Sequence, residues 1–116
     1  MSHLSESERA EIARLIDERL AAAEAERDTA AGGREDIALD QQSVGRLSRI
    51  DAIQRREMAR ATAIRREAEL RRLRAARARL KDPEFGTCAE CGDEIGMGRL
   101  RIDPALIRCA DCTRSA

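Results

Sequence analysis

Residues 88–112 read CAECGDEIGMGRLRIDPALIRCADC, and their four cysteines form two Cys-x-x-Cys pairs. Cys88 pairs with Cys91 and Cys109 with Cys112, and the segment 92–108 separates the two pairs. Each pair can direct two thiolates at one ion, and the intervening loop is long enough to bring the pairs together. Four thiolates in a tetrahedral array are a preferred ligand set for Zn²⁺. The spacing therefore predicts one structural zinc ion held by all four cysteines.

The alternatives for these cysteines are a disulfide or a redox role. Residues 1–8, MSHLSESE, lack the basic region and apolar stretch of a secretory signal, so we expect a cytoplasmic protein. Cytosolic thiols stay reduced, which favours metal binding. Because four protein ligands leave no open position for water, we expect no catalysis at the metal and no enzyme. His3, the only histidine, is expected to be solvated rather than a ligand.

The composition predicts a mainly α-helical chain without a large globular core. Of 116 residues 38% are charged, and Phe85 is the only aromatic residue. Such a composition is typical of long helices and coiled coils. The formal net charge is zero, which gives no overall bias towards nucleic acid. No apolar run approaches the roughly 18–20 residues that span a membrane, so no membrane association is expected.

Two helices are predicted over residues 1–81. Ser5 and Glu8 have the Ser-x-x-Glu spacing of a capping box, which starts the first helix. We expect this helix to break over residues 28–33, Asp-Thr-Ala-Ala-Gly-Gly, because paired glycines are poor in a helix interior and free to turn. Its apolar face recurs at helical spacing through Ile12, Leu15, Ile16, Leu20 and Ala23.

The second helix is expected to begin between Asp36 and Asp40, either of which could serve as its N-cap, and to end near Leu80. Pro83 stops it, because the residue before a proline is disfavoured in the α region. We expect one apolar stripe of this helix to pack inside a hairpin rather than to form an external binding surface. The stripe comprises Val44, Leu47, Ile50, Ile53, Met58, Ala61, Ile64 and Ala68.

Charge and turn position together predict an antiparallel coiled-coil hairpin followed by a small C4 zinc-ribbon-like finger. Residues 1–40 carry 5 basic and 11 acidic side chains, whereas residues 55–81 carry 11 basic and 3 acidic ones. Opposite charges favour pairing of the two arms. We therefore expect a hairpin over residues 1–81, with its tip at about 28–40, and a finger over residues 82–116.

The finger is too short to fold on a hydrophobic core alone. Zinc binding, worth on the order of 10 kcal/mol in small finger peptides, would supply the stability. Gly86 and Gly92 flank the first cysteine pair and can adopt positive φ. A miniature core over the metal is expected from Ile95, Met97, Leu100, Ile102, Leu106 and Ile107.

Hairpin and finger together resemble the DksA/TraR family of bacterial transcription regulators. The resemblance lies in Cys88-Ala-Glu-Cys91-Gly92, then in Ile95, Arg99-Leu100, Pro104 and Cys109-Ala-Asp-Cys112. The stretch over residues 40–52, DQQSVGRLSRIDA, also looks like one found in short members of the family.

The resemblance implies a protein that binds RNA polymerase and not DNA. The hairpin of such proteins enters the secondary channel, its tip approaches the catalytic Mg²⁺, and initiation changes, in the best-studied members together with the alarmone ppGpp. The family's tip pattern Asp-x-x-Asp-x-Ala maps here onto Gly33, Asp36 and Ala38, with Asp40 as a competing acid. We expect a monomeric regulator of initiation that acts through these tip residues.

Two other functions are consistent with the residues. A nucleic-acid-binding zinc ribbon could use the basic end of the second helix, between Arg65 and Arg79, to contact phosphate. A structural coiled-coil protein could self-associate through the apolar stripe. The zero net charge argues against the first, and the oligomeric state would decide the second.

Overall fold

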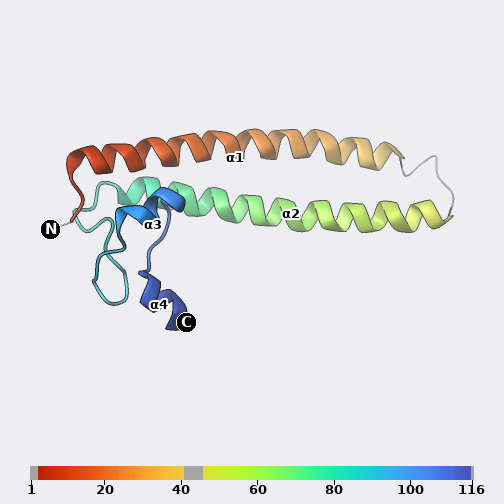
Figure 1. Cartoon of the computed structure of the whole chain (residues 1–116). Coiled ribbons are helices and arrows are strands. Elements are labelled where there is room, and N and C mark those ends of the chain that lie inside the picture. Colours follow the sequence, from red (N-terminus) through yellow and green to blue (C-terminus); the bar gives the residue numbers. More distant parts are fainter. Residues whose placement is uncertain (1–2, 41–45, 116) are drawn as a thin grey trace. The chain divides into compact units, whose positions relative to one another are not determined.

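The structure is a computed structural model that describes the backbone of residues 3–40 and 46–115 and the side chains of residues 3–29 and 48–115. These ranges contain the helices α1 (Glu6–Asp40), α2 (Arg46–Arg79), α3 (Met97–Ile102) and α4 (Ala110–Ser115). The first two form a long helical hairpin, and the predicted mainly α fold is confirmed (Figure 1). None of the described helices is long and apolar enough to cross a membrane.

By their contacts the residues fall into two compact units. The finger unit comprises Met1–Leu20 and Arg71–Ala116, and the hairpin unit comprises Ala21–Leu70. The finger unit thus includes the first turns of α1 and the last turns of α2. The expected domain division, a hairpin over residues 1–81 and a finger over residues 82–116, stays a prediction.

The predicted capping box starts α1. The backbone N–H of Glu8 donates to Ser5 Oγ at 3.1 Å, and the N–H of Ser5 donates to Glu8 Oε1 at 2.9 Å. The Ser5 N–H lowers the pKa of the Glu8 carboxyl, because it stabilises the charged form. Two of the unpaired donors at the helix start are satisfied in this way.

The expected break in the first helix at residues 28–33 is wrong. α1 continues through Gly32 and Gly33 to Asp40, and α2 begins at Arg46. Each glycine costs about 1 kcal/mol in a helix interior. Since one hydrogen bond is gained per residue once a helix has formed, two glycines between good helix formers do not end it. Neither Asp36 nor Asp40 is therefore the N-cap of the second helix.

The expected packing stripe of α2 is wrong for the members that the structure describes, while the side chains of Val44 and Leu47 lie outside the described residues. Ile50, Ile53 and Ile64 are 49%, 52% and 63% exposed, whereas Ala52 and Leu70 are buried. The inward face is fixed by Leu70, and Ala52 lies about five helical turns before it, on the same face. By helical spacing the isoleucines lie about 100–160° around the helix from these two residues, and their side chains are exposed.

Opposite charges pair across the two helices within the hairpin unit. Arg66 Nε lies 3.7 Å from Glu26 Oε2, and Arg27 Nη1 donates to Glu67 Oε1 at 3.5 Å. These side chains are partly exposed, so each pair contributes only about 0–1 kcal/mol. These pairs favour the alignment of α1 with α2, as the charge asymmetry predicts. In the finger unit, Arg77 Nε donates to Asp17 Oδ1 at 2.9 Å.

The finger unit has one hydrophobic core, to which helices and finger contribute together. The predicted inward face of α1 is confirmed, since Ile12 and Ile16 are fully buried. The miniature core expected over the metal is only partly formed, because Ile102 and Ile107 are 76% and 45% exposed. The buried members are Leu4, Ile12, Ile16, Leu73, Ala76, Phe85, Ile95, Leu100 and Ala105.

The end of α2 is held by a side chain from α1. Arg9 Nη1 donates to the carbonyl of Leu80 at 2.8 Å, and Arg9 Nη2 donates to those of Asp82 and Pro83 at 3.1 and 2.9 Å. The guanidinium also lies 6.0 Å from the centre of the Phe85 ring. Carbonyls at a helix C-terminus lack partners within the helix. Arg9 therefore stabilises the point where the chain leaves α2 before the predicted stop at Pro83.

Candidate metal centre

The first cysteine pair lies in a tight backbone turn. The N–H of Gly92 donates to the Cys88 carbonyl at 3.0 Å, and the N–H of Cys88 donates to the Asp93 carbonyl at 2.7 Å. Gly92 has φ of 78°, a left-handed conformation that glycine adopts without steric cost. The predicted positive φ of Gly86, 96°, is likewise confirmed. The turn holds the pair Cys88 and Cys91 on one side of the loop.

The second pair lies at the start of α4. The N–H of Thr113 donates to the Cys109 carbonyl at 3.0 Å, and the N–H of Cys112 points to Cys109 Sγ at 3.5 Å. The N–H of Ala89 donates a hydrogen bond to the Ile107 carbonyl at 2.8 Å, which joins the segments that carry the two cysteine pairs. The helical turn and this cross-link bring both pairs to one place.

The four sulfurs form one cluster. The Sγ atoms of Cys88, Cys91, Cys109 and Cys112 all lie within 4.8 Å of one another. Cys91 Sγ and Cys109 Sγ are 3.6 Å apart. A tetrahedral ion with Zn–S bonds of about 2.3 Å requires sulfurs about 3.8 Å apart. The donor set and its spacing therefore fit a C4 zinc site, and within the described residues no His, Asp or Glu joins this group.

The protonation of the thiols also indicates a site made for a cation. The pKa of Cys88 is lowered to about 6, first because the backbone N–H of Cys91 and then that of Cys109 donate to its sulfur. The pKa of Cys112 is raised strongly by the neighbouring sulfurs, that of Cys109 first. Four thiolates so close together repel one another unless a cation neutralises them. A divalent metal would remove this penalty.

Polar contacts outside the sulfurs brace the loop between the pairs. Arg108 Nη2 lies 2.9 Å from Glu90 Oε1, and Arg99 Nη1 donates to the Arg108 carbonyl at 3.1 Å. The ion pair of Arg108 with Glu90 links residues that lie beside opposite cysteine pairs. The hydrogen bond of Arg99 fixes α3 to the residue before the second pair. The resemblance includes Arg99, but the sequence did not identify these contacts, because a surface arginine carries no signal of its partner. Cys88 and Cys109 are buried while Cys91 is exposed, so the cluster has one side towards solvent.

His3 is not the solvated residue that the sequence predicted. Both ring nitrogens are buried without a hydrogen-bond partner, although the residue as a whole is only half-buried. A Cβ atom placed on Gly86 would lie 3.3 Å from the ring of His3 and 2.9 Å from Leu4 Cδ1. The segment before α1 therefore rests on the loop that leads to Cys88. Among the described residues, His3 lies outside the sulfur cluster.

The expected tip residues are placed only by their backbone. Asp36, Ala38 and Asp40 all lie in the last turns of α1. Their side chains are outside the described residues, and so is the connection over residues 41–45 that follows them. Their role stays a prediction.

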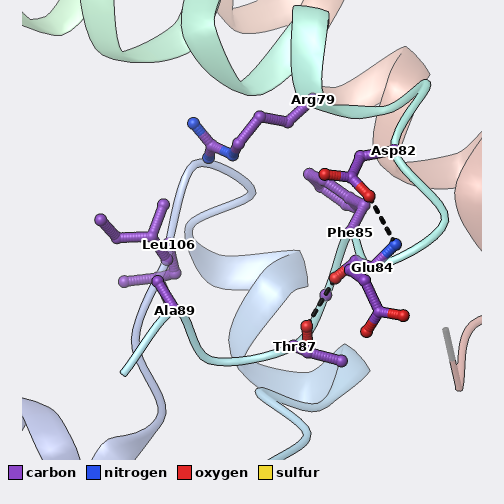
Figure 2. A pocket seen from close by; sticks show the side chains of 9 residues that line it. Arg79, Asp82, Glu84, Phe85, Thr87, Ala89 and Leu106 are labelled. Atoms are coloured by element: carbon purple, nitrogen blue, oxygen red, sulfur yellow. Dashed lines mark hydrogen bonds between the residues drawn. The ribbon is translucent and has the colours of Figure 1, made fainter. Parts of the chain in front are cut away.

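A shallow cavity of about 170 Å³ lies in the finger unit between the end of α2 and the finger loops (Figure 2). Arg79 lines it, and burial followed by the charge of Arg72 lowers the pKa of Arg79. Asp82 and Glu84 line the same cavity, and Asp82 Oδ1 accepts the Glu84 N–H at 2.9 Å. With both charge signs on its rim, the cavity indicates no particular ligand.

Comparisons with known proteins agree with this geometry. The family model described as the prokaryotic dksA/traR C4-type zinc finger matches residues 83–116. The structure of the transcription factor DksA2 from Pseudomonas aeruginosa superposes with a TM-score of 0.85 at 18% sequence identity. That match covers 97% of this chain and 85% of the other. No curated protein sequence matches the chain. The predicted resemblance is thus confirmed in the finger sequence and in the fold.

Proposed function

We propose a transcription regulator that binds RNA polymerase, because residues 83–116 match the family model of the dksA/traR C4-type zinc finger and the chain has the fold of DksA2. In this proposal the hairpin enters the secondary channel of the polymerase. The connection between α1 and α2 then approaches the catalytic Mg²⁺, and initiation is modulated there. No enzymatic activity and no sequence-specific DNA binding are part of the proposal.

One observation carries most of this proposal: the matched finger shares a single hydrophobic core with the ends of α1 and α2. Ile12 and Ile16 from α1, Leu73 from α2, and Ile95 and Leu100 from the finger belong to the same buried cluster. A finger that serves only to bind nucleic acid has no need of such a core with a helical hairpin. The arrangement instead supports a finger that anchors two long helices, in agreement with the structural match.

The proposed zinc ion is structural. Cys88, Cys91, Cys109 and Cys112 would hold it, and four protein ligands leave no position for a substrate or a reactive water. When bound, the ion supplies the positive charge that lets the four thiolates lie together. The regulatory chemistry would come from the acids Asp36 and Asp40 near the end of α1, with Ala38 between them, and ppGpp would act in the polymerase complex.

Binding to purified core RNA polymerase is the direct test. We expect the protein, purified with its metal, to bind core enzyme at micromolar concentration and to protect it from transcript-cleavage factors that use the same channel. A shift of DNA without polymerase, weakening steeply with salt, would favour the nucleic-acid-binding zinc ribbon instead. If the protein neither binds core enzyme nor protects it from the cleavage factors, the proposal is wrong.

Replacement of Asp36 tests the role of the helix end. We expect Asp36→Asn to bind polymerase as the unchanged protein does but to lose most of its effect on transcription, because the neutral side chain no longer perturbs the charge around Mg²⁺. The measurement is in vitro transcription from a responsive promoter, with and without ppGpp. Asp28→Asn, an exposed acid earlier on α1, is the matched control and should behave as wild type. An unchanged promoter response with Asp36→Asn would remove this residue from the mechanism.

A further inference from the structure

The segment before α1 lies on the loop that leads to the first metal ligand. Leu4 is buried and belongs to the same hydrophobic cluster as Phe85 and Ile95. A Cβ atom at Gly86 would lie 2.9 Å from Leu4 Cδ1, so the leucine closely approaches the backbone of this loop. Gly86 precedes Cys88 by two residues. One side chain from outside the finger thus packs against the segment that carries a metal ligand.

Backbone pairing connects this contact to Cys88. The Gly86 carbonyl accepts the N–H of Ile95 at 2.9 Å, and the N–H of Cys88 donates to the Asp93 carbonyl at 2.7 Å. An antiparallel bridge lies between these two hydrogen bonds. Cys88 therefore moves only together with the paired loop. Because zinc leaves when its thiolate ligands move apart, a contact that holds the loop also holds the metal.

The capping box of α1 fixes the same segment from its other end. Ser5 directly follows Leu4; its Oγ accepts the Glu8 N–H at 3.1 Å, and its N–H donates to Glu8 Oε1 at 2.9 Å. The N–H of Arg9 donates to the Ser5 carbonyl at 2.9 Å. Helix ends open more readily than helix interiors. Opening of this first turn would release Leu4 from the loop.

His3 opposes the contact that Leu4 makes. Both ring nitrogens of His3 are buried, and neither has a hydrogen-bond partner among the residues that the structure describes. A buried polar group without a partner loses its hydration and receives no hydrogen bond in exchange. The apolar contact of Leu4 favours a segment packed on the loop, whereas the ring of His3 favours a segment in water. The two neighbours therefore act in opposite directions.

We propose that His3, Leu4 and Ser5 form a latch that controls the release of zinc from the four-cysteine site. In the closed position Leu4 packs on the loop at Gly86, and Cys88 keeps its place. When the latch opens, the loop is free to move and zinc leaves. Leu4 is a positioning residue, since it acts on the ligand through the loop. The latch concerns the metal site and does not depend on binding to RNA polymerase.

The experiment measures the rate at which the intact, zinc-loaded protein releases its metal to an excess of colorimetric chelator, well below the thermal midpoint. We expect Leu4→Ala to release zinc about tenfold faster or more, because the truncated side chain no longer supports the loop. Leu20→Ala is the matched control, since Leu20 packs against the same core about 21 Å along α1 from its start. It should lower the thermal midpoint but keep a release rate close to that of wild type.

Two further variants test the neighbours of Leu4, and they remain informative if Leu4→Ala does not fold. Ser5→Ala removes one hydrogen bond of the capping box and should accelerate zinc release severalfold. His3→Phe keeps an aromatic ring but removes the unpaired nitrogens, so release should slow severalfold.

Cobalt substitution separates the latch from the ligands. The absorption bands of bound Co²⁺ depend on the ligands and their geometry. They should be the same in Leu4→Ala and in wild type, because the variant keeps all four cysteines. A changed spectrum would show that Leu4 fixes the ligand geometry itself, which overturns the latch.

Each rate decides the inference. Equal acceleration in Leu4→Ala and Leu20→Ala overturns the latch, since zinc would then leave through unfolding of the whole finger unit. An unchanged rate in Leu4→Ala or in Ser5→Ala also overturns it. Unchanged or faster release from His3→Phe overturns the opposing role of His3. Wild-type protein that binds no zinc overturns the metal site and the latch together, whereas failure to bind polymerase overturns only the proposed function.

Discussion

Arg9 contacts residues that lie far from it in the sequence. Its guanidinium donates to the carbonyls of Leu80, Asp82 and Pro83 within 3.1 Å. We expect Arg9→Ala to lower the free energy of unfolding by about 2 kcal/mol, because hydrogen bonds to a charged donor are lost and carbonyls at the helix end stay unsatisfied. Urea denaturation of the metal-bound protein measures the change.

Arg14→Ala is the control for this replacement, since Arg14 is exposed on the same helix. It should change stability by less than about 0.5 kcal/mol. Equal stability losses for both variants would show that Arg9 acts as an ordinary surface residue. No sequence pattern predicted the role of Arg9, because a bond over 71 positions depends on which turns of two helices come together.

Gly86 is a second residue whose importance comes from its surroundings. It has φ of 96°, and a Cβ atom there would lie 2.9 Å from Leu4 Cδ1. We expect Gly86→Ala to cost roughly 1–3 kcal/mol, from backbone strain and displacement of Leu4. Gly98→Ala is the matched control, because Gly98 lies within α3 and nothing stands within 4 Å of its Cβ position. If thermal unfolding shows the two variants equally stable, the contact between Leu4 and this loop is not formed.

At the scale of the element, the length of α1 can be tested with glycines. α1 runs through Gly32 and Gly33 to Asp40. In a continuous helix, Gly32→Ala/Gly33→Ala should raise helicity and add about 1 kcal/mol per site, because alanine has the higher helix propensity. In a turn that needs positive φ, the same changes would destabilise the protein. Circular dichroism and urea denaturation distinguish the two, and a loss of helicity would restore the turn at residues 28–33.

The face of α2 shows why helical periodicity alone was insufficient. Two apolar repeats run along this helix, one through the isoleucines and one through Ala52 and Leu70. The isoleucines give the more hydrophobic repeat, so the sequence favoured them as the packing face. The structure buries the other repeat, because it continues into Leu73 and Ala76 of the finger core. The face of a helix that contacts the most packing partners becomes its buried face.

At the scale of the whole chain, removal of zinc should affect the two units unequally. Zinc binding contributes on the order of 10 kcal/mol in finger peptides. We expect a chelator to abolish amide-exchange protection in the finger unit, including the first turns of α1, while helical protection persists in the hairpin unit. Hydrogen exchange measured with and without metal tests this. Cys109→Ser should give the same pattern without a chelator, and full protection of the finger in that variant would exclude a structural metal.

Acid should release the metal, because protons and the metal ion compete for the same thiol groups. Without metal the pKa of Cys88 is about 6 and that of Cys112 lies above its ordinary value. Metal binding requires all four as thiolates, so protons compete with it and affinity falls as pH falls. We expect zinc release and loss of finger stability on acidification, and no such loss on a moderate rise in pH. Zinc release monitored with a colorimetric chelator across pH checks the sign.

The sequence alone determined the ligand set, the capping box, the hairpin and the resemblance in the finger. These features depend on short-range spacing: four cysteines at fixed intervals, or Ser5 three residues before Glu8. Only the tertiary structure decided which face of α2 is buried, how far α1 extends, and that Arg9 and Leu4 join helix and finger. Those outcomes depend on contacts between residues distant in the sequence. Several choices of face and register have similar local energies, and packing of the complete core selects one of them.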